Sequence, residues 1–224
     1  MSDQHPKHRW TAEEVRTRIL WPDEKFYHLR HYENPLVNAA FNFLAHKEIN
    51  TPHSLLKNIP HILVMSEEMT EIYRQPAFST ISQSGTPYIL VNPGFIRPGN
   101  HTSQELISAF THELGHFAKG HITPQGIADL YNDIDLKPRE KQADHYAVNR
   151  CQGEGLVSLL LKLQSRQHAA FDRDPKNKGL SFDDWQRNLD PDHPVMSETI
   201  SRLKKEINAA SARCEVKPQS GFSR

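Results

Sequence analysis

The run His112-Glu113-Leu114-Gly115-His116 combines two imidazoles and a carboxylate at a spacing that suits metal chemistry. Residues four positions apart lie one above the other on a helix, so His112 and His116 can bind one zinc ion. Glu113 lies one step further round, where its carboxylate can act as a general base on water in the open metal position. The alternative is a pair of histidines on a solvated helix face.

The residues before this run predict the helix that carries it. Ser103 can cap the helix, and Glu105 follows in the first turn. An apolar stripe recurs at helical spacing, formed by Leu106, Phe110, Leu114 and Phe117. Both histidines lie away from this stripe. The helix therefore has one face for the core and another for a metal.

A catalytic zinc site needs a third protein ligand, for which Glu140 is the best candidate. Pro138 and the charged residues after it predict a new helix, on which Glu140 and Asp144 share a face. We expect Glu140 to bind the metal and Asp144 to accept a hydrogen bond from the far ring nitrogen of His112. Ala143 is small enough for close helix packing. The alternative is two carboxylates on a solvated helix.

Three segments in this order resemble the HtpX and CAAX-prenyl-protease type of gluzincin metallopeptidase. They are HELGH with His121 behind it, the E-x-x-A-D run from Glu140 to Asp144, and the pair His193-Pro194 before a last helix. The resemblance covers residues 60 to 205. It implies an α+β, mostly helical, zincin-like domain with a small, mainly antiparallel sheet. It also implies that His112, His116 and Glu140 bind zinc, that Glu113 is the catalytic base, and that Asp144 supports a ligand.

The activity implied by the resemblance is that of a zinc-dependent endopeptidase, with one Zn²⁺ per chain and a protein or peptide as substrate. His193 would line the cleft near the metal, where it could donate a hydrogen bond to the oxyanion or occupy the open zinc position in a resting state. A purely structural His-Pro turn is the alternative. Family members usually carry an arginine six residues after that histidine, whereas this chain has Thr199. Arg202 lies one turn further along and could replace it.

Two other interpretations stay open. One is a non-catalytic or latent protein of the same fold that binds zinc or peptides; Glu113 argues against it and Thr199 in its favour. The other is a regulatory metallopeptidase like ImmA/IrrE, although the Leu-Leu-Met-Pro-like stretch typical of that group is missing and the His-Pro element disfavours it. A DNA-linked protease is disfavoured because 27 Lys+Arg balance 27 Asp+Glu.

Composition and termini suggest a soluble, cytoplasmic protein. The 224 residues suffice for one domain with an ample core. No apolar run reaches the roughly 18 residues that span a bilayer, and the N-terminus lacks the apolar segment of a signal peptide. The two cysteines are expected to be free thiols. The pattern predicts disorder over residues 1–10, one domain over 11–212 and a flexible tail over 213–224, and does not predict an oligomeric state.

Other elements follow from local signals. Thr11 to Glu14 reads as a capping box, and Asn34-Pro35 as the start of a helix. The apolar side of that helix is expected to contain Leu36, Ala40, Phe43 and Leu44. Strands are expected over 59–65, 78–82 and 88–91, and a final helix over 195–210. The polar stretch 171–192 could form a lid anchored by Phe182 and Trp185.

Two further expectations concern substrate and surface. The strand Tyr88-Ile89-Leu90-Val91 precedes the zinc helix, and as a sheet edge it could bind an extended substrate through main-chain hydrogen bonds; an ordinary core strand is the alternative. His121 is expected to make a structural hydrogen bond. His101, His145 and His168 are expected on the surface.

Overall fold

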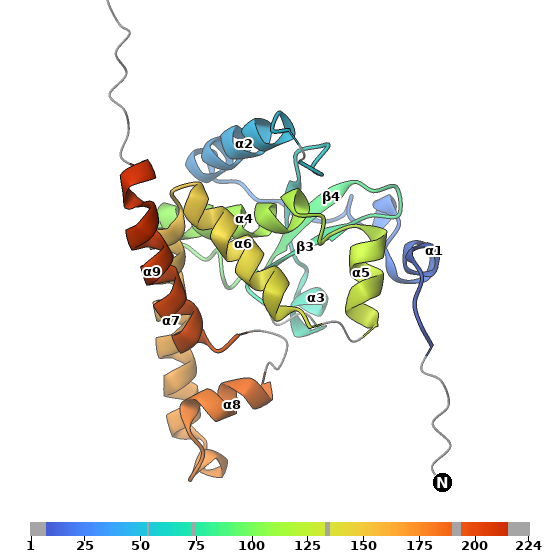
Figure 1. Cartoon of the computed structure of the whole chain (residues 1–224). Coiled ribbons are helices and arrows are strands. Elements are labelled where there is room, and N and C mark those ends of the chain that lie inside the picture. The colour runs from blue at the N-terminus through green and yellow to red at the C-terminus, as the bar shows by residue number, and fades with distance from the viewer. Residues whose placement is uncertain (1–7, 53, 73–74, 133–134, 190–193, 215–224) are drawn as a thin grey trace, which may run out of the picture.

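The protein has an α+β architecture in which helices predominate around one small sheet (Figure 1). The computed structural model describes residues 8–52, 54–72, 75–132, 135–189 and 194–214, the last four without their side chains. The helices are α1 Ala12–Glu14, α2 Pro35–Ile49, α3 Glu67–Ile72, α4 Ser103–Ala118, α5 Pro124–Tyr131, α6 Lys137–Asn149, α7 Gly153–Arg173, α8 Phe182–Leu189 and α9 Met196–Cys214. The strands are β1 Arg30–His31, β2 His61–Val64, β3 Ala77–Ile81 and β4 Pro87–Val91, and short π or 3₁₀ turns cover Val15–Ile19, Asp23–Lys25 and Pro175–Asn177.

The sheet is mixed and has the order β1-β2-β4-β3. β2 and β4 run parallel, whereas the β1–β2 and β3–β4 pairings are antiparallel. The three predicted strands are present, and β1 is an additional short one. β3 and β4 form a hairpin whose turn contains Gly85 at φ 90°, a backbone conformation that glycine adopts without strain.

The prediction that Tyr88-Ile89-Leu90-Val91 is a sheet edge is wrong. This segment is β4, which pairs with β2 on one side and β3 on the other, and all its residues are buried. Its side chains alternate between two apolar clusters, with Ile89 and Val91 in the main core and Tyr88 and Leu90 against Phe26 on the opposite face. In this sheet the edge beside β4 is β3.

The N-cap of α4 is one residue earlier than predicted. Thr102, not Ser103, is the N-cap, and its hydroxyl and the carboxylate of Glu105 form a reciprocal capping box. The predicted apolar stripe is buried in full: Leu106, Phe110, Leu114 and Phe117. Figure 1 shows α4 crossing the middle of the molecule, and it packs against α2, α6 and α7.

Glycine and alanine allow α6 to approach α4 closely. A Cβ atom on Gly115 would lie 3.0 Å from Cβ of Tyr146 and 3.1 Å from Cα of Ala143, both on α6. Such contacts are tighter than ordinary van der Waals packing, so any larger residue at 115 would push the helices apart. The fourth residue of the H-E-x-x-H run is therefore set by helix packing.

Several local predictions need correction. Trp10, inside the stretch expected to be disordered, exchanges two backbone–side-chain hydrogen bonds with Asn132 (2.8 and 2.9 Å) and packs on Tyr131. The rest of that expectation over 1–7, and the flexible tail from 215 on, lie outside the described residues. α2 buries Val37, Phe41 and Ala45, whereas Leu36 and Phe43 are exposed. The helix is apolar on two sides, so periodicity alone does not choose the buried one.

The predicted lid is mostly helical. α7 continues to Arg173, and α8 covers much of the remainder. Phe182 anchors the segment, since its ring stacks on His168 of α7, with the ring centroids 3.5 Å apart, whereas Trp185 packs against Phe171 within the segment. α9 extends to Cys214, four residues past the predicted end, and runs beside α7 (Figure 1).

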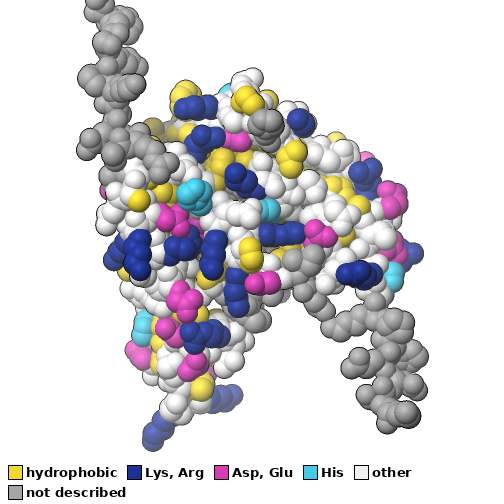
Figure 2. Space-filling model, in the orientation of Figure 1, with side chains coloured by type: hydrophobic (Ala, Val, Ile, Leu, Met, Phe, Trp, Pro, Cys, Tyr) yellow, Lys and Arg dark blue, Asp and Glu magenta, His cyan; other side chains and the backbone are white. Residues whose placement is uncertain are grey.

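The cysteine prediction is also wrong. Cys151 is disulfide-bonded, and the structure has no free cysteine among the residues it describes. The expectation of a cytoplasmic protein rested partly on free thiols and loses that support. Within the described ranges, none of the helices combines the length and the apolar character needed to span a membrane. Basic and acidic side chains are interspersed over the face in Figure 2.

Candidate metal centre

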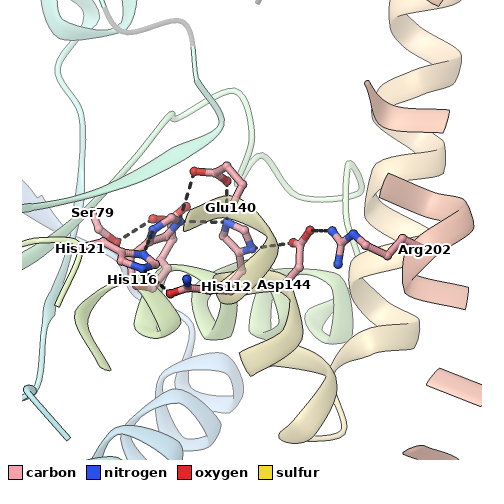
Figure 3. A network of polar contacts seen from close by, with 9 residues as sticks. Ser79, His112, His116, His121, Glu140, Asp144 and Arg202 are labelled. Carbon is pink, nitrogen blue, oxygen red and sulfur yellow. Dashed lines mark hydrogen bonds and ion pairs between the residues drawn. The ribbon is translucent and has the colours of Figure 1, made fainter. Parts of the chain in front are cut away.

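His112, His116 and Glu140 converge between α4 and α6, as predicted from their spacing. One ligand atom from each of the three side chains lies within 4.8 Å of the other two. Nε2 of His112 lies 3.2 Å from Nε2 of His116, and Glu140 carboxylate oxygens lie 3.3 and 3.6 Å from these two nitrogens. Figure 3 shows the three side chains pointing toward one another.

These separations fit one tetrahedral metal ion. With zinc–ligand bonds of about 2.0–2.1 Å, two ligand atoms at the tetrahedral angle lie about 3.3 Å apart. The three measured separations bracket this value. Two imidazoles and one carboxylate are also the donor set of a catalytic zinc site that leaves a fourth position for water. The geometry and chemistry of these residues therefore fit a single zinc ion.

A hydrogen-bond chain sets the tautomer of His112. Its Nδ1 lies 2.9 Å from Oδ1 of Asp144, whose carboxylate accepts a hydrogen bond from Nδ1–H. In the neutral imidazole the lone pair is then on Nε2, which faces Glu140. The other oxygen of Asp144 accepts a hydrogen bond from Arg202 on α9, and Arg202 also pairs with Glu206 at 2.8 Å. The predicted role of Asp144 agrees with this geometry.

A second chain sets the tautomer of His116. Its Nδ1 lies 3.0 Å from Nδ1 of His121, whose Nε2 lies 3.0 Å from Oε1, the side-chain amide oxygen of Gln142. Because that oxygen can only accept, Nε2 of His121 donates, and Nδ1 of His121 accepts from His116. Nε2 of His116 is then unprotonated as well. When His112 is neutral, two lone pairs and a carboxylate face one point, an arrangement that a cation stabilises, either a proton on His112 or a metal ion.

The pKa values of the two histidines shift in opposite directions. Burial lowers the pKa of His112, but its bonds to Asp144 and Glu140 outweigh burial and raise the pKa well above its ordinary value. Burial dominates at His116 and lowers its pKa to about 3. The carboxylates thus favour a positive charge at this point, while His116 stays a free base available to a metal.

Glu113 follows His112 on α4, and its side chain contacts the sheet edge. Oγ of Ser79 on β3 donates a 2.6 Å hydrogen bond to Oε2 of Glu113 and lies 3.1 Å from the main-chain oxygen of Glu113. Figure 3 shows Ser79 reaching this end of the network, opposite Arg202. Ser79 gave no signal in the sequence, because nothing local indicates which strand lies against the motif helix.

The remaining predicted residues divide into three groups. His193 lies outside the described residues. Thr199 is buried on α9, and Arg202, one turn further along, contacts Asp144 and thereby supports a ligand. Tyr88, Ile89, Leu90 and Val91 lie in the core rather than at the site.

Comparisons with known proteins identify no relative of this chain, so its proposed function rests on the site. No family model, no curated protein and no solved structure matches this chain.

Proposed function

We propose that this protein is a zinc-dependent endopeptidase of the gluzincin type that resembles the HtpX and CAAX-prenyl proteases. The observation that carries the proposal is the convergence of His112, His116 and Glu140, with Glu113 next to His112 in the same helix. A purely structural zinc site normally has four protein ligands and no need of a base. Among the described residues, three side chains can serve as ligands and a fourth, Glu113, follows His112 on the same helix, which favours chemistry on a water molecule.

The residues would divide the reaction among them. Zinc, when bound by His112, His116 and Glu140, would lower the pKa of water and polarise the scissile carbonyl. Glu113 takes a proton from the attacking water and delivers it to the leaving amine. Asp144 and His121 hold the two histidines in the tautomers that expose Nε2. The proposed reaction thus depends on side chains that hydrogen bonds hold in position: Glu113 through Ser79, and the two histidines through Asp144 and His121.

We propose that an extended substrate binds along β3, the edge strand, and not along β4 as first expected. Hydrogen bonds from Asn92 N to Pro76 O and from Ser82 N to Thr86 O, both 2.9 Å, set the phase of the β3–β4 ladder. Alternation along an antiparallel pair then directs the backbone groups of Ala77 and Ser79 away from β4. These groups can pair with an extended peptide next to Glu113.

The decisive experiment compares the wild type with Glu113→Gln on a casein-like substrate. The variant keeps the size of the side chain and removes the base, so we expect hydrolysis to fall at least about 100-fold while zinc content stays at one per chain. Glu154→Gln, an exposed change on α7, is the matched control. Equal turnover by Glu113→Gln and wild type would refute Glu113 as the base.

Metal analysis separates this proposal from a non-catalytic zinc protein. Glu140→Ala should lower zinc stoichiometry, because it removes one of three ligands. Arg202 contacts Asp144, an observation that favours the non-catalytic alternative because this arginine supports a ligand rather than the oxyanion. Wild-type protein that holds zinc and cleaves none of a panel of unfolded proteins and peptides would establish that alternative.

A further inference from the structure

Ser79 joins the open sheet edge to the side chain proposed as the catalytic base. It comes from the middle of β3, and its hydroxyl crosses to α4, where Oγ lies 2.6 Å from Oε2 of Glu113. At this distance an O–H···O⁻ bond is in the short, charge-assisted range. Ser79 is half-buried, so water competes less for this bond than at an open surface.

The contact restricts a side chain that otherwise has several rotamers. Glu113 follows a metal-ligand histidine on the helix, yet helix geometry fixes only its backbone and leaves three side-chain torsions to its neighbours. A hydroxyl fixed on the sheet can select one orientation of the carboxylate. The same hydroxyl lies 3.1 Å from the main-chain oxygen of Glu113. It therefore contacts both the side chain and the backbone of this residue.

We propose that Ser79 is a positioning residue that holds the Glu113 carboxylate in its working orientation, an inference that rests on the proposed peptidase function. The same residue directs its backbone groups to the open edge, where the substrate would pair. The strand that receives the peptide is thus the strand that orients the base. A peptide residue opposite Ser79 lies next to Glu113, which places the scissile bond there.

An isosteric pair of variants tests the role of the hydroxyl. Ser79→Thr keeps the hydroxyl. Ser79→Val has the shape of the threonine variant but lacks the hydroxyl, and Ser79→Ala removes the hydroxyl with the least steric change. We expect kcat to fall about 10- to 100-fold in the Val and Ala variants, with KM and zinc content close to wild type. The urea unfolding midpoint should fall modestly, because a hydrogen bond to a carboxylate is lost. Ser79→Thr should retain most of the activity. Crystals of Ser79→Ala should show Glu113 in more than one orientation.

The outcomes separate the role of Ser79 from the proposed peptidase function on which it rests. Wild-type protein that binds zinc without hydrolysing peptides would end both. Normal kcat in Ser79→Val and Ser79→Ala, with an active wild type and inactive Glu113→Gln, would overturn only the role of Ser79. A parallel loss of zinc content or stability in all three Ser79 variants would also overturn it, because Ser79 would then simply tie β3 to α4.

Discussion

At the scale of single residues, the two histidines of the motif depend on different partners. His112 is held by a carboxylate that an arginine also contacts, whereas His116 is held by a neutral histidine and an amide. The charged partner raises the proton affinity of His112, and the neutral chain leaves burial to lower that of His116. Of the residues that hydrogen-bond to the two histidines from outside the metal group, only Asp144 among the described residues would then place a negative charge near a bound zinc ion.

Asp144→Asn should weaken zinc binding by about 10- to 100-fold, because the neutral amide no longer fixes the His112 tautomer. Competition with a chromophoric chelator measures the change. Glu206→Gln is the control, since Glu206 contacts Arg202 without touching a proposed ligand. A zinc affinity of Asp144→Asn within twofold of the wild type would contradict the supporting role of Asp144.

At the scale of elements, the site depends on the close approach of two helices. α4 contributes both histidines and Glu113, and α6 contributes Glu140, Asp144 and the Gln142 that ends the second chain. Their spacing is set where Gly115 meets Ala143 and Tyr146. A shift of α6 by a few tenths of an ångström changes every distance between Glu140 and the histidines.

Gly115→Ala should disturb the metal group without altering a ligand. The added Cβ meets backbone of α6 at 3.1 Å, so the helices must separate. Overpacking of this kind costs about 1–3 kcal/mol in the free energy of unfolding, which exceeds the gain in helix propensity. Urea unfolding in a chelator measures the stability, and a zinc titration should show weaker binding. Unchanged values in both assays would show that α6 can relax freely.

At the scale of the whole molecule, a buried histidine next to α4 links stability to pH. His101 was expected on the surface, but its side chain is fully buried, packs at a tilt against Phe95 and has no hydrogen bond among the described residues. The nearest carboxylate oxygen, on Glu105, lies 3.7 Å from Nδ1 and pairs with Lys162 at 2.8 Å. Burial, together with the charge of Arg166, lowers the pKa of His101.

His101→Leu should stabilise the protein and flatten its acid sensitivity. The folded state resists protonation of His101, so below the unfolded pKa of about 6.5 the unfolded chain binds the extra proton and stability falls with pH. Removing the imidazole should reduce that slope by up to about 1.4 kcal/mol per pH unit. It should also add about 1 kcal/mol at pH 7 by deleting two unpaired nitrogens.

Urea unfolding from pH 7 to pH 5, in a chelator for both proteins, measures the two effects. The chelator is needed because proton uptake by metal ligands would otherwise add to the slope. An identical pH slope in His101→Leu and wild type would show that His101 is protonated equally in both states. His145→Gln, an exposed change, should alter stability at pH 7 by less than about 0.5 kcal/mol.

Local spacing was enough to pair the two histidines on one helix face and the two carboxylates on another. His112 and His116 share a helix face because they are four residues apart, and the same rule pairs Glu140 with Asp144. The stripe from Leu106 to Phe117 then orients the first helix toward the core. These relations lie within single helices, so hydrophobic period and capping residues determine them.

Only the tertiary structure decided which distant segments meet. It put β4 inside the sheet and β3 at its edge, brought Ser79 to Glu113 and Arg202 to Asp144, and buried His101 and the Phe41 side of α2. Strand order and the choice between two apolar helix faces depend on pairing and packing between residues far apart in the chain. A local pattern is the same for an edge strand and for an interior one, because the free energy that separates them comes from the neighbours.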